Sequence, residues 1–187
     1  HIWEANYSAL AVVQPELAKS LSEFALPSGA RWVLGRDGQL TAQLDATATS
    51  CGWLGGSSKP SVSARAILRD FVCTGTNVLL PDIASGEEAA VLCRKMMPQC
   101  AVFVQVPSLG VLKTALHVSE LEQWIASGRL VFLHGPGLDQ ALMTFLRAHP
   151  GYEVPSRLVT LPHLEVGSID AMRTQLEGCA LQIERER

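Results

Sequence analysis

The stretch from Asn77 to Val106, NVLLPDIASGEEAAVLCRKMMPQCAVFVQV, decides the fold. Its hydrophobic pattern predicts, in order, a strand at 78–80, a turn at 81–86, a helix through Met97 and a second strand at 101–106. A strand, a crossover helix and a second strand make one βαβ unit, from which parallel sheets with ligand-binding crevices are built. The remaining residues are therefore interpreted around a parallel sheet.

Length and composition limit the class of protein. The chain has 187 residues, of which 48% are hydrophobic and 18% charged. That is enough for one domain with a well-buried core and a small added subdomain, and it excludes a disordered chain. No apolar run approaches the roughly 20 residues that cross a bilayer. The formal net charge of -3 gives no general attraction to nucleic acid. We expect no membrane span and no nucleic-acid partner.

The cysteines and the chain ends indicate a compartment and a context. The five cysteines are an odd number without C-x-x-C spacing, which favours reduced core residues in a cytoplasmic protein: Cys51, Cys73, Cys93, Cys100 and Cys179. The chain begins at His1 without a secretory signal pattern and ends in the charged run Glu184–Arg187. We expect a domain of a longer protein, whose partner is a catalytic domain of the same polypeptide or a second copy.

Residues 1–58 form the first predicted unit, a helical and β-hairpin preface. Two helices are expected within residues 2–25, divided at Pro15, because proline fits the first turn of a helix and disrupts its interior. The Asp37-Gly38 pair between two strand-like runs is a hairpin signal. A third short strand is expected to include Trp53-Leu54.

Residues 59–187 form the second predicted unit, in which helices and strands alternate. After a helix at 61–72 and the central βαβ unit, the pattern predicts these further elements: helices at 109–116, 119–127, 138–146 and 169–183, and strands at 129–134 and 157–161. Such alternation predicts right-handed crossovers and helices on both faces of the sheet. The expected fold is α/β, a Rossmann-like three-layer sandwich with a mostly parallel sheet.

The first turn, Pro81–Gly86, is where a nucleotide or S-adenosylmethionine site has its glycines. Here the turn holds a single glycine, and five side chains obstruct a close approach to the backbone. Ser85 and Glu88 match a capping box at the start of the next helix. Carboxylates at that helix N-terminus repel a phosphate.

The second strand lacks the acidic residue that normally holds ribose hydroxyls. It ends in Gln105-Val106-Pro107-Ser108. We therefore expect a Rossmann-like scaffold that binds no cofactor.

A resemblance follows from three runs of sequence: Val78–Gly86, Ala101–Leu112 and Leu121–Leu133. They resemble the Rossmann-like N-terminal domains of bacterial glycosylation proteins, namely spore-maturation-type glycosyltransferases and the motility accessory factor family, which are like degenerate class I methyltransferases. Those domains have a glycine-rich first turn and a Glu-Pro-Asp after the second strand. Here Val106 and Ser108 replace that Glu and Asp. The resemblance thus implies the fold and a link to glycosylation, and it does not imply the ligand.

Three polar residues follow strands at their predicted carboxyl ends: Asp82, Ser108 and His134. Together with Gly86 of the first turn they are the candidate cofactor-binding residues. The alternative is that they cap helices and bond to backbone. A Ser-His-Asp hydrolase is disfavoured because the Gly-x-Ser-x-Gly elbow is absent. The other histidines lack metal-ligand spacing: His1, His117, His149 and His163.

Three functions remain open on the sequence alone. The first is a non-catalytic accessory domain of a larger, glycosyltransferase-related protein that acts in packing or recognition. The second is a divergent S-adenosylmethionine- or nucleotide-sugar-binding enzyme domain that uses Asp82, Ser108 and His134. The third is an oligomerisation module with a large apolar interface.

Overall fold

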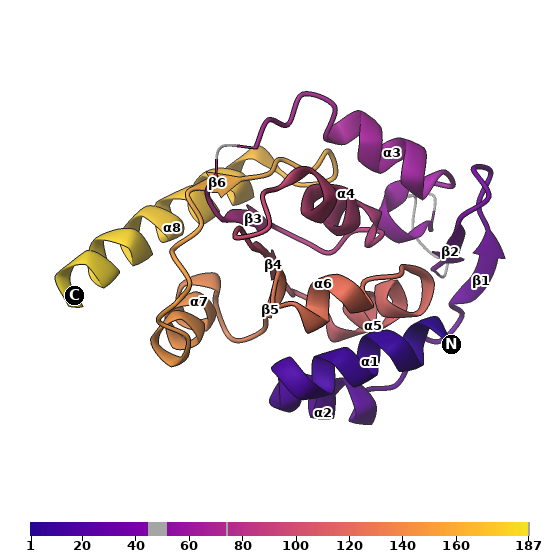
Figure 1. Cartoon of the computed structure of the whole chain (residues 1–187). Coiled ribbons are helices and arrows are strands. Elements are labelled where there is room, and N and C mark those ends of the chain that lie inside the picture. The colour runs from indigo at the N-terminus through magenta and orange to yellow at the C-terminus, as the bar shows by residue number, and fades with distance from the viewer. Residues whose placement is uncertain (45–51, 74, 187) are drawn as a thin grey trace.

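Four short parallel strands form the central sheet of the computed structural model, which describes residues 1–44, 52–73 and 75–186 (Figure 1). In chain order they are β3 (Val78–Leu80), β4 (Val102–Gln105), β5 (Leu130–Leu133) and β6 (Arg157–Leu158). Their order across the sheet is β5-β4-β3-β6. The chain thus adds two strands on one side of β3 and returns to the other side, so the strand order reverses between β3 and β6. In open α/β sheets such a reversal marks the ligand crevice.

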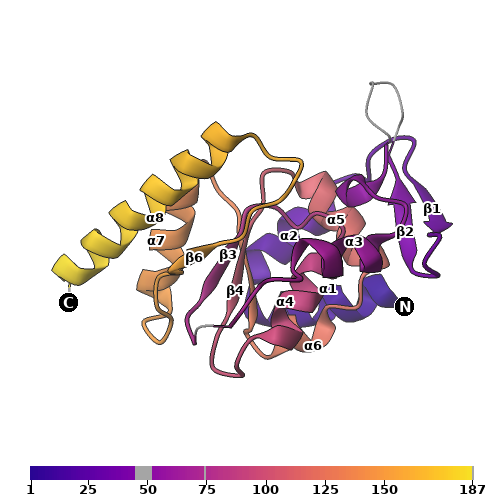
Figure 2. The ribbon, with the colours of Figure 1, turned by 90° about the horizontal axis from the view of Figure 1, so that it is seen from above.

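Helices cover both faces of this sheet, which confirms the predicted three-layer fold (Figure 2). One face packs α3 (Pro60–Ile67), α4 (Glu87–Lys95), α5 (Leu109–Val118) and α6 (Glu122–Ala126). The other face packs α7 (Leu138–Ala148) and α8 (Val166–Glu186). Neighbouring strand residues point to opposite faces, so Leu80 and Val104 belong to the first core and Leu79 and Phe103 to the second. Continuous apolar strands are what a sheet covered on both faces requires.

The preface has its predicted elements. Helices α1 (Ile2–Val13) and α2 (Pro15–Glu23) are divided at Gln14, and strands β1 (Arg31–Leu34) and β2 (Leu40–Gln43) form an antiparallel hairpin. The expected strand at Trp53-Leu54 is reduced to a single bridge between Trp53 and Gln43, because the 3-10 turn η1 (Leu54–Gly56) follows at once.

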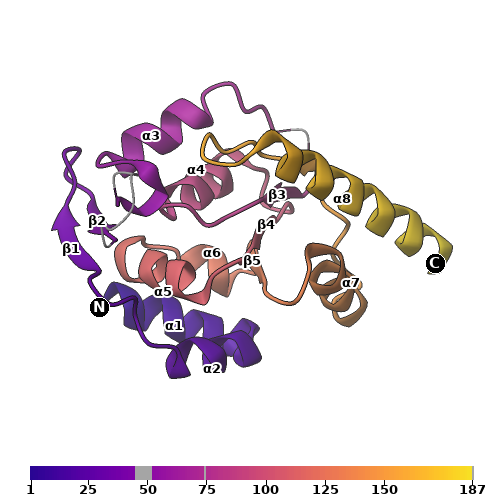
Figure 3. The same ribbon diagram turned by 180° about the vertical axis from the view of Figure 1, so that it is seen from behind.

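Two amide side chains, the buried Asn6 and the half-buried Gln14, attach α1 and α2 to the rest of the fold. The Asn6 amide nitrogen donates to the carbonyls of Leu116 and Ser119 at 2.8 and 2.7 Å, and its oxygen accepts from the Leu121 N–H at 2.9 Å. The Gln14 amide donates to the Phe132 carbonyl at 2.7 Å and accepts from the Phe132 N–H at 2.9 Å. Gln14 therefore pairs with the backbone N–H and C=O groups of Phe132 at the outer edge of β5. Figure 3 shows α1 and α2 lying against α5 on this side.

Two helices end earlier than predicted. Helix α3 ends at Ile67 rather than at Val72, because the chain turns through tighter bonds from the Arg69 and Phe71 N–H groups to the carbonyls of Ala66 and Leu68. Helix α4 ends at Lys95 rather than at Met97. The residue before Pro98 is disfavoured in helical conformation, which explains that stop.

The capping box predicted for 119–122 is wrong. Ser119 donates its hydroxyl to the Ser85 carbonyl at 2.8 Å, and α6 begins at Glu122 with Leu121 at its N-cap. A tertiary hydrogen bond has taken the side chain that the local pattern assigned to the helix. The strand predicted for 157–161 is also shorter, although the Val159 N–H still bonds to the Leu79 carbonyl.

The cysteines are mostly where they were expected. Cys93, Cys100 and Cys179 are buried and free, and Cys73 is partly exposed, whereas Cys51 lies outside the described residues. Burial raises the pKa of the Cys93 thiol to about 12. This thiol is therefore a core group rather than a nucleophile. Within the described ranges, no helix combines the length and hydropathy needed to cross a membrane.

The buried amide of Asn6 gives a first prediction. Asn6→Ala removes three hydrogen bonds and leaves buried backbone groups unpaired, so the free energy of unfolding falls by about 2–4 kcal/mol. Urea denaturation followed by circular dichroism measures it. The control is Ser22→Ala, which removes an exposed hydroxyl bond and costs less than about 0.5 kcal/mol. Equal losses in the two variants contradict the role given to Asn6.

Candidate functional site

The turn between β3 and α4, residues 81–86, lies at the carboxyl edge of the sheet. Its single glycine, Gly86, has a φ of 89° and is the N-cap of α4. A Cβ at Gly86 would lie 2.6 Å from the Ser119 hydroxyl oxygen, so a larger residue does not fit. The space beside Gly86 is therefore occupied by the side chain of Ser119.

A second contact reaches the same turn from the preface. Gly55 of η1 has a φ of 67°, and a Cβ there would lie 2.7 Å from the Ser85 backbone nitrogen and 2.9 Å from the Ser85 Cβ. Only a glycine allows the two backbones to come this close. Protein atoms from η1 and from the α5–α6 connection therefore lie directly against the turn.

The carboxylate of Glu88 occupies the N-terminus of α4. One of its oxygens accepts from the Ser85 hydroxyl at 2.6 Å and from the Ser85 N–H at 3.1 Å, while the Ser85 hydroxyl oxygen accepts from the Glu87 N–H at 3.2 Å. Half of the predicted capping box is therefore present: Glu88 bonds back to the Ser85 N–H, but the N-cap is Gly86 and the Ser85 hydroxyl takes the Glu87 N–H. Glu88 is only 1% exposed, and burial raises the pKa of its carboxyl group. The positive end of the helix is thus already matched by an acid.

The end of β4 offers no charged group. Val106 is 4% exposed, and the Ser108 hydroxyl oxygen accepts from the Val111 N–H at 3.4 Å as the N-cap of α5. Ser108 therefore caps a helix, which is the alternative role that the sequence left open for it.

An acid and a histidine meet where the strand order reverses. Asp82 follows β3, His163 lies beyond β6, and their Oδ2 and Nε2 atoms are 3.4 Å apart. The hydrogen bond to Asp82 raises the pKa of His163. The other carboxylate oxygen of Asp82 is buried without a hydrogen-bond partner. His163 was missed in the sequence because it follows a two-residue strand. The one sequence feature that could have pointed to His163 was its position just after the predicted fourth strand.

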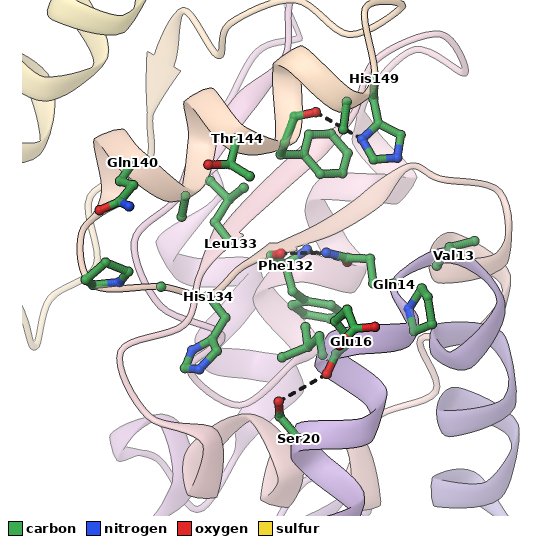
Figure 4. Close-up of a pocket in the computed structure, with 17 residues that line it drawn as sticks. Val13, Gln14, Glu16, Ser20, Phe132, Leu133, His134, Gln140, Thr144 and His149 are labelled. Atoms are coloured by element: carbon green, nitrogen blue, oxygen red, sulfur yellow. Dashed lines mark hydrogen bonds between the residues drawn. The ribbon is translucent and has the colours of Figure 1, made fainter.

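His134 lies elsewhere along the edge. It follows β5, its Nδ1 is 3.4 Å from the Val106 carbonyl oxygen, and it lines a cavity of about 490 Å³ between α2 and α7 (Figure 4). Within the described part of the chain, no hydrogen bond joins any two of Asp82, Gly86, Ser108 and His134. The described residues also contain no cluster of three or more side chains able to hold a metal ion.

Comparison with known proteins bears on the fold. No protein-family model matches the chain, and no curated protein matches its sequence. Among solved structures it is similar to the MAf glycosyltransferase from Magnetospirillum magneticum AMB-1, with a TM-score of 0.66 and 11% identity. The match covers 96% of this chain and 35% of that one, so the chain spans about a third of that protein. This likeness agrees with the predicted Rossmann-like fold and with the motility accessory factor part of the resemblance.

Two neighbouring glycines test the contact on the turn. Gly55 and Gly56 both have positive φ, but a Cβ at Gly55 meets Ser85 while one at Gly56 meets nothing within 4 Å. Gly56→Ala therefore costs only backbone strain, about 1–2 kcal/mol. Gly55→Ala adds a backbone collision, and we expect an additional loss of about 1–3 kcal/mol in urea denaturation. Equal losses would mean that η1 does not press on the turn.

The buried acid predicts a pH effect. Because the native pKa of Glu88 is raised above its ordinary value of 4.5, its contribution to stability is full below that pH and is lost as pH rises through the native pKa. Glu88→Gln keeps an acceptor for Ser85 and cannot ionise. The variant should therefore gain stability relative to the wild type between pH 5 and pH 8, as measured by denaturation at each pH.

Two controls accompany that measurement. Glu165→Gln, at an exposed position, should show no such trend. Since the Glu88 charge also helps to raise the pKa of His163, the comparison is repeated with His163→Gln in both proteins. A stability difference that stays flat with pH, or that falls, contradicts the assignment.

Proposed function

We propose that this chain is a non-catalytic accessory domain of a larger, glycosyltransferase-related protein, where it acts in packing or recognition beside a catalytic module. One observation supports the context: the fold is similar to about a third of a MAf glycosyltransferase, in line with the resemblance expected from the sequence. The proposed partner is a catalytic domain of the same polypeptide or a second copy of the chain.

The observation that carries the proposal is the contact between Gly55 and Ser85. In a Rossmann-type site the first turn is bare so that a ligand can approach its backbone. Here that close approach is made by the backbone of η1. A cofactor at this turn would have to displace the preface, together with the Ser119 side chain that packs on Gly86.

Two further features oppose a nucleotide at the same place. The Glu88 carboxyl group lies in the first turn of α4 and bonds to Ser85 just before the helix, where a negative group disfavours a phosphate. The buried Val106 stands where a carboxylate would hold a ribose. Both changes act against the same class of ligand.

Calorimetry tests the proposal directly. The chain is titrated with S-adenosylmethionine and, separately, with UDP-glucose. We expect no saturable heat, because neither the turn nor the end of β4 is available. The proposal is overturned by a dissociation constant in the micromolar range that Gly86→Ala or Asp82→Ala abolishes.

A ligand-binding enzyme domain is the second candidate, and one observation favours it: the buried, unpartnered oxygen of Asp82. Such an atom is costly unless something bonds to it. This candidate requires Asp82 and His134 to take part in any binding detected. Binding that survives Asp82→Ala and His134→Ala unchanged eliminates it. Light scattering of the chain addresses the third candidate, an oligomerisation module.

A further inference from the structure

The cavity beside His134 lies at the opposite edge of the sheet from the reversal of strand order. The N-terminal turn of α2, the end of β5 and one face of α7 enclose it, as Figure 4 shows. Its volume of about 490 Å³ falls within the roughly 300–1,000 Å³ typical of small-molecule sites. Strand β4 and β3 separate it from β6, so it is independent of the Asp82–His163 pair.

The cavity exists because α7 has two apolar faces. Leu138, Leu142 and Leu146 are buried in the core against the sheet. The second face lines the cavity, and at three of its positions it carries short side chains, Ala141, Thr144 and Ala148. The sheet does not need this second face. Small residues on it leave open space beside an aromatic wall.

That wall is the ring of Phe145. It stacks on His149, with ring centroids 4.2 Å apart and planes 17° from parallel. Its other contacts are edge-on, with Phe103 at 5.6 Å and Tyr152 at 5.2 Å between centroids. Because Phe145 is held by three neighbours, its position is fixed, and with the stacked His149 it gives the cavity an aromatic wall.

The opposite wall is held by Gln14. Its two hydrogen bonds to the Phe132 backbone fix the corner between α1 and α2 at the edge of β5. Pro15 and Leu17 on this corner face the cavity. The site is therefore formed before any ligand binds, which reduces the entropic cost of binding.

The polar groups around the cavity indicate the charge of its ligand. The Thr144 hydroxyl, the Gln140 amide and the Glu16 carboxylate line it, and none makes a side-chain hydrogen bond within the described residues. Glu16 is the only carboxylate in the lining, and no lysine or arginine lines the cavity. Two histidines, His134 and His149, line the cavity as well. A cation would thus find a carboxylate here, whereas a phosphate or carboxylate would find imidazoles and no lysine or arginine.

We propose that this cavity binds a planar, cationic ring compound that packs against the aromatic wall of Phe145 and His149 and places its charge near Glu16. The aromatic wall sets the shape of the ligand, the unpaired groups hydrogen-bond its edge, and the carboxylate selects its charge. This site lies beyond the proposed accessory role and does not depend on it.

Three indoles test the proposal, with a cationic, a neutral and an anionic substituent at the same ring position: tryptamine, 3-methylindole and indole-3-acetate. Each is titrated into the isotopically labelled chain and followed by amide chemical shifts. We expect shifts centred on His134, Gln140 and Thr144. Tryptamine should bind roughly three- to tenfold more tightly than 3-methylindole, as one partly screened ion pair predicts, and indole-3-acetate should bind most weakly.

Matched variants assign the effect to the cavity. Glu16→Gln should remove the preference for tryptamine and leave 3-methylindole unchanged, while Glu23→Gln, exposed at the far end of α2, should change neither. Thr144→Trp fills the cavity and should abolish binding of all three probes. Ala148→Trp replaces it if the first variant fails to fold.

Two results overturn the proposal. One is equal affinity for the three probes, or an affinity order that Glu16→Gln does not change. The other is the absence of shifts at the cavity residues with millimolar probe. In either case the result of the S-adenosylmethionine titration is unaffected, because that experiment reports on the turn at 81–86.

Discussion

The close contact of Gly55 with the Ser85 backbone is the constraint on which the rest of the structure depends. It requires a glycine with positive φ, and it brings the preface onto the first turn of the parallel sheet. Ser119 reaches the same turn through a hydrogen bond to the Ser85 carbonyl. The preface segment η1 and the α5–α6 connection therefore both pack on the turn at 81–86. They cover the surface that related folds leave open for a ligand.

Much of the fold could be predicted because periodicity reports burial. The strands at 78–80 and 101–106 are continuous apolar runs, and the parallel sheet formed as expected. The break between the first two helices at Pro15 and the hairpin at Asp37-Gly38 are local effects, so they too were readable. Boundaries were less certain, as at α4, where Pro98 ended the helix two residues early.

The site could be predicted only in part, since its decisive contacts are tertiary. The pairing of Ser85 with Glu88 is local, three positions apart, and was found from sequence, although Gly86 is the N-cap. The contact between Gly55 and Ser85 joins segments thirty positions apart, and nothing near Gly55 announced it. The same holds for Ser119, whose local pattern pointed to a helix cap while its hydroxyl bonds to Ser85. His163 likewise meets Asp82 only after the chain folds.

The two edges of the sheet differ in a way that matters for function. At the reversal of strand order, an acid, a histidine and a buried glutamate interact with protein groups. At the β5 edge, Gln14 satisfies the strand backbone, yet a cavity with unpaired polar groups remains. A Rossmann-like scaffold thus places its open surface away from the usual crevice.

Protein atoms from η1 and Ser119 fill the turn at 81–86, where we propose that no cofactor binds. Crystals of the chain soaked with S-adenosylhomocysteine and, separately, with UDP-glucose test this at the turn itself. We expect that η1 stays against Ser85 and that no ligand density appears at the turn. Density for an adenosine or uridine group lying against Pro81–Gly86, with Gly55 displaced, would contradict it.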